Sequence, residues 1–228
     1  MKQLKALSPV ELTEKQLELF QKLYEEMIIY NEHTNLTSIT KKTDVIVKHF
    51  IDSYWVFKEH AFPKHATILD VGTGPGYPGL PLKIIEPTLK LTLLDSNLKK
   101  IQYLKHVSEQ LELTHTTFAY ERAEDHAKKN LNHYDIIVSR ATANMSTLLE
   151  LCIPMLRENG LLYLYVTPQQ IASENIMNAL KILKTTTFNK HDYELPLHYG
   201  KRSIMVFKKQ KHVIGYPRPY AIILKKGL

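Results

Sequence analysis

The chain contains very little cysteine and no long apolar segment. Cys152 is the one cysteine among 228 residues, so no disulfide can form within the chain. Because it lies in an apolar helical pattern with Leu148, Leu149 and Met155, we interpret it as a core residue. No apolar run approaches the roughly 20 residues of a membrane span, and the N-terminal residues lack the apolar stretch of a secretory signal. We therefore expect a soluble cytoplasmic protein without a membrane partner, and a monomer is the default expectation.

The histidines and acidic residues do not form a recognisable metal motif. Eleven histidines are present, but none has zinc-ligand spacing with cysteine or with paired acids. His49 and Asp52 lie three residues apart in a predicted helix, so they share one face. A metal pair and an acid/base pair are alternatives there. No metal is predicted.

Glycine is scarce but concentrated. Four of the eight glycines, Gly72, Gly74, Gly76 and Gly79, fall within eight residues directly after the apolar run 67–71. Only a residue without Cβ lets the backbone pass against a bulky ligand or turn through positive φ without strain. This cluster predicts a nucleotide-cofactor loop at the end of a strand, and the alternative is a tight strand-to-helix turn that binds nothing.

Two cofactors use such a loop, and acidic residues distinguish them. Residues 74–79 match the G-x-G-x-x-G pattern of dinucleotide binders, which alone is a weak signal. Asp70 places a carboxylate at the strand end, where it would repel a pyrophosphate but not S-adenosylmethionine, which carries a sulfonium and an ammonium. Asp95 ends the next predicted strand, where it could accept both ribose hydroxyls, the alternative being a helix N-cap. The pattern favours S-adenosylmethionine as cofactor.

The rest of the chain indicates an α/β fold. A capping box at Thr13 to Gln16 opens an N-terminal helix, and a second helix is expected from Thr43 to Phe57. We then expect five parallel buried strands, alternating with helices, and a C-terminal hairpin at the sheet edge. The expected strands are 67–71, 90–95, 115–120, 134–139, 160–166, 186–195 and 203–208, and the helices between them are 80–86, 97–111, 146–156 and 169–183. This predicts a Rossmann-like, seven-stranded class I S-adenosylmethionine-dependent methyltransferase fold, with a helical extension at 1–60, a core at 61–210 and a basic tail at 211–228.

Positive charge is concentrated near the C-terminus. The formal net charge is +7, but residues 181–228 contain eleven lysines and arginines against two acids, so the remainder carries −2. This bias favours a domain that binds its cofactor in the body and a polyanion with its C-terminal third. The alternative is a merely solvated basic tail.

Several motifs together resemble one family. They are Asn35-Leu36-Thr37, residues 49–53 (HFIDS), residues 70–82 (DVGTGPGYPGLPL), Leu94-Asp95-Ser96 and Ser139-Arg140-Ala141. Over residues 20–208 the chain is similar to the RsmG (GidB) family of bacterial rRNA methyltransferases. The resemblance implies methylation of N7 of one guanine in small-subunit (16S) rRNA, with the rRNA or the 30S particle as partner.

The resemblance also implies roles for individual residues. Gly72 and Tyr77 would line the cofactor loop, and Ala123 and Glu124 would face the adenosine. Asp70, Gly74, Gly76, Asp95 and Ser96 are also expected to bind the cofactor. For His49 and Asp52, the family context favours a structural hydrogen bond. Arg140 would face the cofactor or the target as the catalytic residue, where it could stabilise charge on O6 or hold a phosphate, with a surface ion pair as the alternative. Arg122, Lys201 and Arg202 would contact RNA, or be solvated cations. No general base is required, because the guanine N7 lone pair lies in the ring plane and carries no proton.

The sequence departs from the family pattern at two places. Residues 164–168 (LYVTP) lack the Lys-Gly that usually follows the fifth strand, and residues 219–224 (PYAIIL) replace the usual glycine and proline continuation after Tyr216-Pro217-Arg218. Three alternatives therefore stay open: a divergent paralogue acting on another RNA site, a non-catalytic RNA-binding factor, and a small-molecule methyltransferase.

Overall fold

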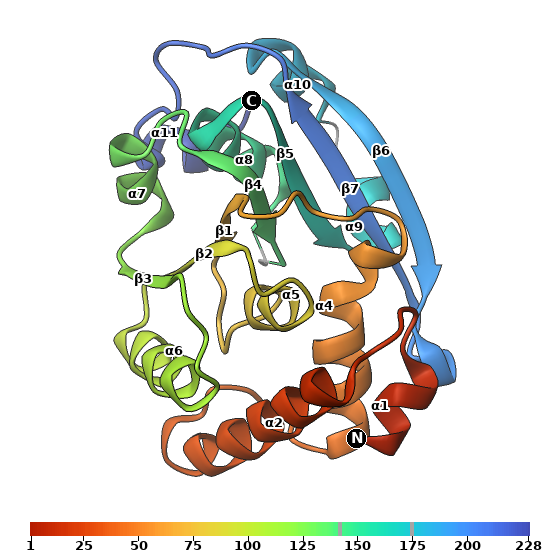
Figure 1. Cartoon of the computed structure of the whole chain (residues 1–228). Coiled ribbons are helices and arrows are strands. Elements are labelled where there is room, and N and C mark those ends of the chain that lie inside the picture. Colours follow the sequence, from red (N-terminus) through yellow and green to blue (C-terminus); the bar gives the residue numbers. More distant parts are fainter. Residues whose placement is uncertain (141–142, 174–175) are drawn as a thin grey trace.

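A central β-sheet organises the molecule (Figure 1). The computed structural model describes residues 1–140, 143–173 and 176–228. Within these residues the strands form one seven-stranded sheet of order β3-β2-β1-β4-β5-β7-β6. Strands β1 to β5 are mutually parallel, and β7 is antiparallel to both β5 and β6, which confirms the predicted fold class. The strands are β1 Thr67–Val71, β2 Lys90–Asp95, β3 Thr116–Tyr120, β4 Tyr134–Ser139, β5 Leu156–Val166, β6 Thr185–Glu194 and β7 Lys201–Lys209.

Helices cover both faces of the sheet and bury two apolar cores. Neighbouring strand residues point to opposite faces, so Ile68 belongs to one core and Leu69 to the other. The first core contains residues of α1, α2, α5 and α6, and the second contains residues of α7, α8, α10 and α11. These helices are α1 Lys2–Leu7, α2 Glu14–Thr34, α5 Gly79–Ile85, α6 Leu98–Gln110, α7 Ala123–Lys129, α8 Met145–Cys152, α10 Met177–Ile182 and α11 Tyr220–Lys225.

The N-terminal extension packs directly on the first core. The predicted capping box is confirmed: the Thr13 hydroxyl accepts from the Gln16 amide, and the Gln16 side chain accepts from the Thr13 amide. The predicted second helix is continuous, but its centre is wound as a π-helix, with α3 Lys42–Asp44, η1 Val45–Ile51, α4 Asp52–Tyr54 and η2 Trp55–Lys58. Inside this core the Phe20 ring centroid lies 5.0 Å from that of Phe50 and 5.6 Å from that of Tyr54. One apolar cluster therefore spans both sides of the predicted boundary at residue 60, and that boundary stays a prediction.

Three elements differ from the sequence-based expectation. Helix α7 was not predicted, because its seven residues are mostly charged and bury only His126 and Ala127. The helix expected to reach Leu156 ends at Cys152, because a 3-10 turn with Pro154 follows and Leu156 begins β5. In the helix expected over 169–183, the structure has α9 (Pro168–Ser173) and α10, with residues 174–175 outside the described part.

Two further observations bear on the predictions. Cys152 is fully buried, and burial raises the pKa of its thiol to about 12, which confirms it as a core residue. No helix among residues 1–140, 143–173 and 176–228 is long and apolar enough to span a membrane.

The hairpin matters because of where its second strand begins. Strand β6 forms the edge of the sheet, and the 3-10 turn η4 (Pro196–His198) connects it to β7. Because β7 is antiparallel to β5, with Ser203 opposite Val166, the start of β7 lies beside the carboxyl end of β5. Lys201 and Arg202 therefore lie at the same end of the sheet, the carboxyl end of its parallel strands, as the loops that follow β1 to β4.

Candidate active site

A pocket of about 370 Å³ lies at the carboxyl ends of β1 to β4. In an open parallel sheet this edge is where ligands bind, because the βα loops gather there. Seven residues selected from the sequence line it: Gly72 after β1, Asp95 and Ser96 at the end of β2, Arg122, Ala123 and Glu124 after β3, and Arg140 after β4. The fold thus brings four separate loops together around one cavity.

Four other residues selected from the sequence, Asp70, Gly74, Gly76 and Tyr77, are not among the residues lining that pocket. Asp70 is fully buried behind the loop, where its Oδ2 accepts from the Thr73 hydroxyl at 2.6 Å and from the Gly79 amide at 2.7 Å. Burial raises the pKa of this carboxyl to about 6, although both hydrogen bonds act against the rise. Its Oδ1 has no hydrogen-bond partner among the described residues. The visible role of Asp70 is to fix the shape of the glycine loop.

The two central glycines serve different purposes. Both have positive φ, +59° at Gly74 and +94° at Gly76. A Cβ on Gly74 would meet nothing within 4 Å, whereas on Gly76 it would lie 2.3 Å from Leu80 Cδ1 and 2.9 Å from Leu104 Cδ2. Gly76 is therefore needed for packing between α5 and α6, while Gly74 keeps open space in front of the loop.

Asp95 connects the glycine loop to the second strand. Its Oδ2 accepts from the Gly74 amide at 3.0 Å and lies 3.6 Å from Lys100 Nζ, and its Oδ1 accepts from the Asn97 amide at 2.8 Å. The N-cap of α6 is Asn97 rather than Asp95. Because each carboxylate oxygen has two lone pairs, Asp95 retains acceptor capacity toward a ligand in the pocket.

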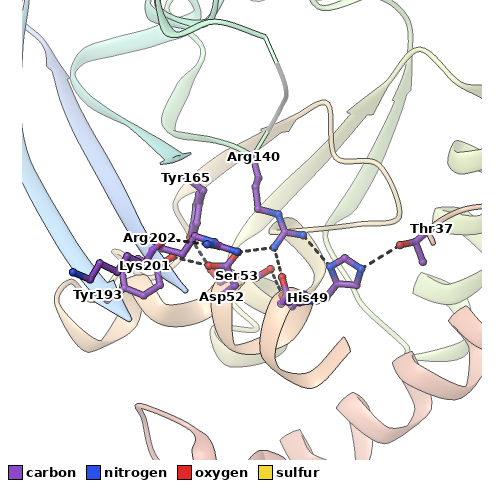
Figure 2. A network of polar contacts seen from close by, with 10 residues as sticks. Thr37, His49, Asp52, Ser53, Arg140, Tyr165, Tyr193, Lys201 and Arg202 are labelled. Atoms are coloured by element: carbon purple, nitrogen blue, oxygen red, sulfur yellow. Dashed lines mark hydrogen bonds and ion pairs between the residues drawn. The ribbon is translucent and has the colours of Figure 1, made fainter. Parts of the chain in front are cut away.

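Arg140 is held by the N-terminal extension (Figure 2). Its Nη1 donates to the Lys48 carbonyl at 2.8 Å and to Asp52 Oδ2 at 3.0 Å, and its Nη2 lies 3.3 Å from His49 Nδ1. Asp52 is buried, and its Oδ1 accepts from the Tyr193 hydroxyl at 2.8 Å. The extension and β6 thus fix a guanidinium on the pocket wall.

The contacts of His49 define its protonation state. Burial, and secondarily the charge of Arg140, lower the pKa of His49 to about 3, so the ring is neutral near pH 7. Since a guanidinium can only donate, Nδ1 accepts from Arg140 and the ring proton lies on Nε2, which donates to the Thr37 hydroxyl at 3.3 Å. His49 and Asp52 do share a face, as predicted, but both bind Arg140.

The Tyr77 ring packs against the His49 ring and lies near the Arg140 guanidinium. Its ring stacks on His49 with centroids 4.4 Å apart and planes at 13°, and the Arg140 Cζ lies 5.7 Å from its centroid. Burial raises the pKa of its hydroxyl. Tyr77 therefore positions His49 and Arg140, and its ring contacts give no direct evidence of a cofactor contact.

The three cations selected for RNA binding occupy one edge of the sheet. Lys201 and Arg202 line a second pocket of about 360 Å³, together with Lys190 and the acids Asp192 and Glu194. Arg122 lines the first pocket, where its Nε lies 3.2 Å from Glu124 Oε1 and its guanidinium lies over the Tyr220 ring, 5.4 Å from the centroid. Arg122 thus lies on the wall of the first pocket, whereas Lys201 and Arg202 line a separate pocket.

Sequence reasoning missed the contribution of the C-terminal tail to this site. Tyr220, from α11, lines the first pocket together with Thr147, Leu148 and Leu151 of α8. The one sequence signal was the departure from the family pattern at residues 219–224, which says nothing about where the tail lies.

Comparisons with known proteins identify the family. The family model described as "rRNA small subunit methyltransferase G" matches residues 16–195. A Bacillus subtilis protein named ribosomal RNA small subunit methyltransferase G is 40% identical over 216 residues, covering 92% of this chain and 89% of that protein. The protein of that name from Acholeplasma laidlawii is 36% identical over 223 residues, covering 96% and 95%.

Solved structures share the fold at low sequence identity. TYW2 from M. jannaschii, in complex with AdoMet, aligns with a TM-score of 0.53 at 13% identity over 66% of this chain and 70% of that one. TrmN from Thermus thermophilus aligns with a TM-score of 0.51 at 17% identity, over 64% and 44%. These likenesses support the Rossmann-like methyltransferase fold, and the matches over nearly the whole chain confirm the resemblance seen in the sequence. The chain belongs to the rRNA small subunit methyltransferase G family.

Proposed function

We propose that this protein transfers a methyl group from S-adenosylmethionine to N7 of a guanine in small-subunit rRNA. The observation that carries the proposal is Arg140, held rigidly on the wall of a pocket at the carboxyl ends of β1 to β4, in a chain of this family. The substrate is small-subunit rRNA or the 30S particle, and the enzyme acts as a cytoplasmic monomer.

The residues of the pocket fit the cofactor. Asp95, at the end of β2, offers carboxylate oxygens to ribose hydroxyls, and Leu148 and Leu151 give the pocket an apolar wall suited to an adenine ring. Open space lies beside Gly74, and the acids Glu121 and Glu124 also line the pocket. A cationic ligand with one aromatic base matches this combination better than a pyrophosphate does.

The chemistry requires positioning more than proton transfer. Bound S-adenosylmethionine supplies an electrophilic methyl group on a sulfonium, and guanine N7 attacks with a lone pair that needs no deprotonation. The protein must therefore place the base in line and accommodate the positive charge that the ring gains. Arg140 donates hydrogen bonds, so it suits the O6 oxygen or a neighbouring phosphate.

The cations at the edge of the sheet extend the proposal to RNA binding. Lys201 and Arg202 lie beside the carboxyl end of β5, where the usual Lys-Gly is replaced by Thr167-Pro168. We assign these two residues to phosphate contacts, as proposed for Arg122. A small metabolite would not need Lys201 and Arg202, which lie outside the pocket that would hold the cofactor.

The test is a map of N7-methylguanine in small-subunit rRNA from cells with and without the gene, followed by methylation with the purified protein and cofactor. Loss of one methylated guanine in vivo and its restoration in vitro is the expected result. Arg140→Ala should fail to restore it, while Lys64→Ala, which changes an exposed lysine before β1, should restore it. An unchanged map would overturn the assignment and favour a divergent paralogue.

A further inference from the structure

The C-terminal tail is anchored to the body of the protein by a buried ion pair. Glu150 of α8 has no exposed surface, and its carboxylate accepts from Arg218 through two charge-assisted contacts, Nε to Oε1 and Nη2 to Oε2, both at 2.6 Å. The Arg218 amide adds a third hydrogen bond to Oε1 at 3.1 Å. Such a bidentate pair fixes orientation as well as distance. The tail residues around Arg218 therefore have a defined position.

The anchor places one aromatic ring at the pocket. Two residues after Arg218, helix α11 begins with Tyr220, while Ile223 of the same helix is buried in the second core. Tyr220 is half-buried and lines the pocket, where its ring lies under the guanidinium of Arg122 from the β3–α7 turn. Helix α8 links both features, because Glu150 holds the tail while Thr147, Leu148 and Leu151 line the same pocket.

We propose that Tyr220 is a cofactor-binding residue that closes the adenosine end of the pocket, and that the Arg218–Glu150 pair positions it there. The ring belongs to the adenosine end because its neighbours Arg122, Ala123 and Glu124 follow β3, next to the ribose-facing Asp95 at the end of β2. A tyrosine ring held on one side by a guanidinium offers its remaining surface to a base. The tail is then part of the cofactor site in addition to carrying charge for RNA.

The inference rests on the proposed cofactor, so the experiment measures binding without RNA. Calorimetric titration of the full chain with S-adenosylhomocysteine is compared among wild type, Tyr220→Ala, Tyr220→Phe and Ile222→Ala, which changes an exposed residue of the same helix. Tyr220→Ala should raise Kd by about tenfold, as loss of an aromatic–base stack does. Tyr220→Phe and Ile222→Ala should stay within about twofold of wild type, since one keeps the ring and the other lies outside the pocket.

Two further measurements locate the contact and test the anchor. Methylthioadenosine, which lacks the amino-acid part, should lose affinity for Tyr220→Ala by the same factor as S-adenosylhomocysteine. Arg218→Ala should weaken binding of S-adenosylhomocysteine as much as Tyr220→Ala does. The double variant should bind no more weakly than either single variant, because both changes remove the same contact between Tyr220 and the ligand. Lys225→Ala, which removes an exposed charge from the same helix, is the matched control.

The outcomes separate this inference from the proposed function. A wild-type protein that binds no S-adenosylhomocysteine would overturn the proposed cofactor and this inference together. Normal wild-type binding with unchanged affinity in Tyr220→Ala would overturn the inference alone. Additive losses in the Arg218→Ala, Tyr220→Ala double variant would refute the positioning role of the ion pair. Unfolding curves identify any variant whose loss comes from unfolding, and Tyr220→Phe then remains as the folded comparison.

Discussion

Alanine at Gly74 and at Gly76 should separate cofactor binding from stability. Both positions have positive φ, so alanine costs roughly 1–2 kcal/mol at each, partly offset by about 0.4–1 kcal/mol from the stiffer unfolded chain. At Gly76 the new methyl group also meets the fully buried Leu80 and Leu104 at 2.3 and 2.9 Å, and overpacking adds about 1–3 kcal/mol. At Gly74 it points into open space. We therefore expect a stability loss of about 1 kcal/mol for Gly74→Ala and about 2–4 kcal/mol for Gly76→Ala.

Ligand binding should show the reverse order. The open space beside Gly74 is where we place the cofactor, so its alanine variant should bind S-adenosylhomocysteine at least about tenfold more weakly, a loss of ~1.4 kcal/mol. Denaturant unfolding without ligand gives the stabilities, and calorimetry at a temperature where both variants are folded gives the affinities. A Gly74→Ala variant that binds like wild type would refute the placement of the cofactor. Equal destabilisation by the two variants would refute the packing argument.

Three further predictions concern the Arg140 group and the RNA surface. Asp52→Asn keeps the acceptor for Tyr193 but removes the charge facing Arg140, so the free energy of unfolding should fall by about 1–2 kcal/mol in denaturant titrations; unchanged stability would contradict a structural ion pair. His49 has a folded-state pKa of about 3 against 6.5 unfolded, so the unfolded state binds more protons between these values and stability falls as pH drops below 6.5. Between pH 7 and pH 5 wild type should lose up to about 2 kcal/mol more than His49→Gln, and parallel pH profiles would count against the neutral ring. RNA affinity should fall by orders of magnitude between low and moderate salt, and removing Lys201 and Arg202 together should reduce the log–log salt slope by about 1–2; a slope equal to that of wild type would exclude these residues from phosphate contact.

Local signals in the sequence predicted several of the residues that line the pocket at the carboxyl ends of β1 to β4. Clustered glycines and an acid at a strand end are short-range patterns, and parallel strands necessarily bring their carboxyl ends to one edge. The sequence alone therefore predicts that Gly72 and Asp95 lie at the same pocket. Arg140 was also selected, although only its resemblance to a family motif indicated it.

Contacts between distant segments could not be predicted in the same way. His49 and Asp52 share a face by helical spacing, but nothing in that spacing indicates that an arginine about ninety residues later lies between them. Tyr220 is a similar case, because its position depends on the buried partner of Arg218 in α8. In both cases the decisive contact is tertiary, and the local pattern is equally compatible with a solvated surface.

The contacts that hold Arg140 join segments that are synthesised at very different times. Asp52 receives its hydrogen bond from Tyr193, 141 residues later, and the Ser53 carbonyl receives one from Tyr165, 112 residues later. A ribosome making this chain from the N-terminus exposes the glycine loop and Arg140 well before the hairpin that completes their support. The glycine loop is therefore made early, but the Tyr193 contact behind Arg140 and the Tyr220 wall of the pocket are added only after most of the protein has emerged. In a nascent chain, the support of Arg140 is thus complete only once the last third of the protein has been made.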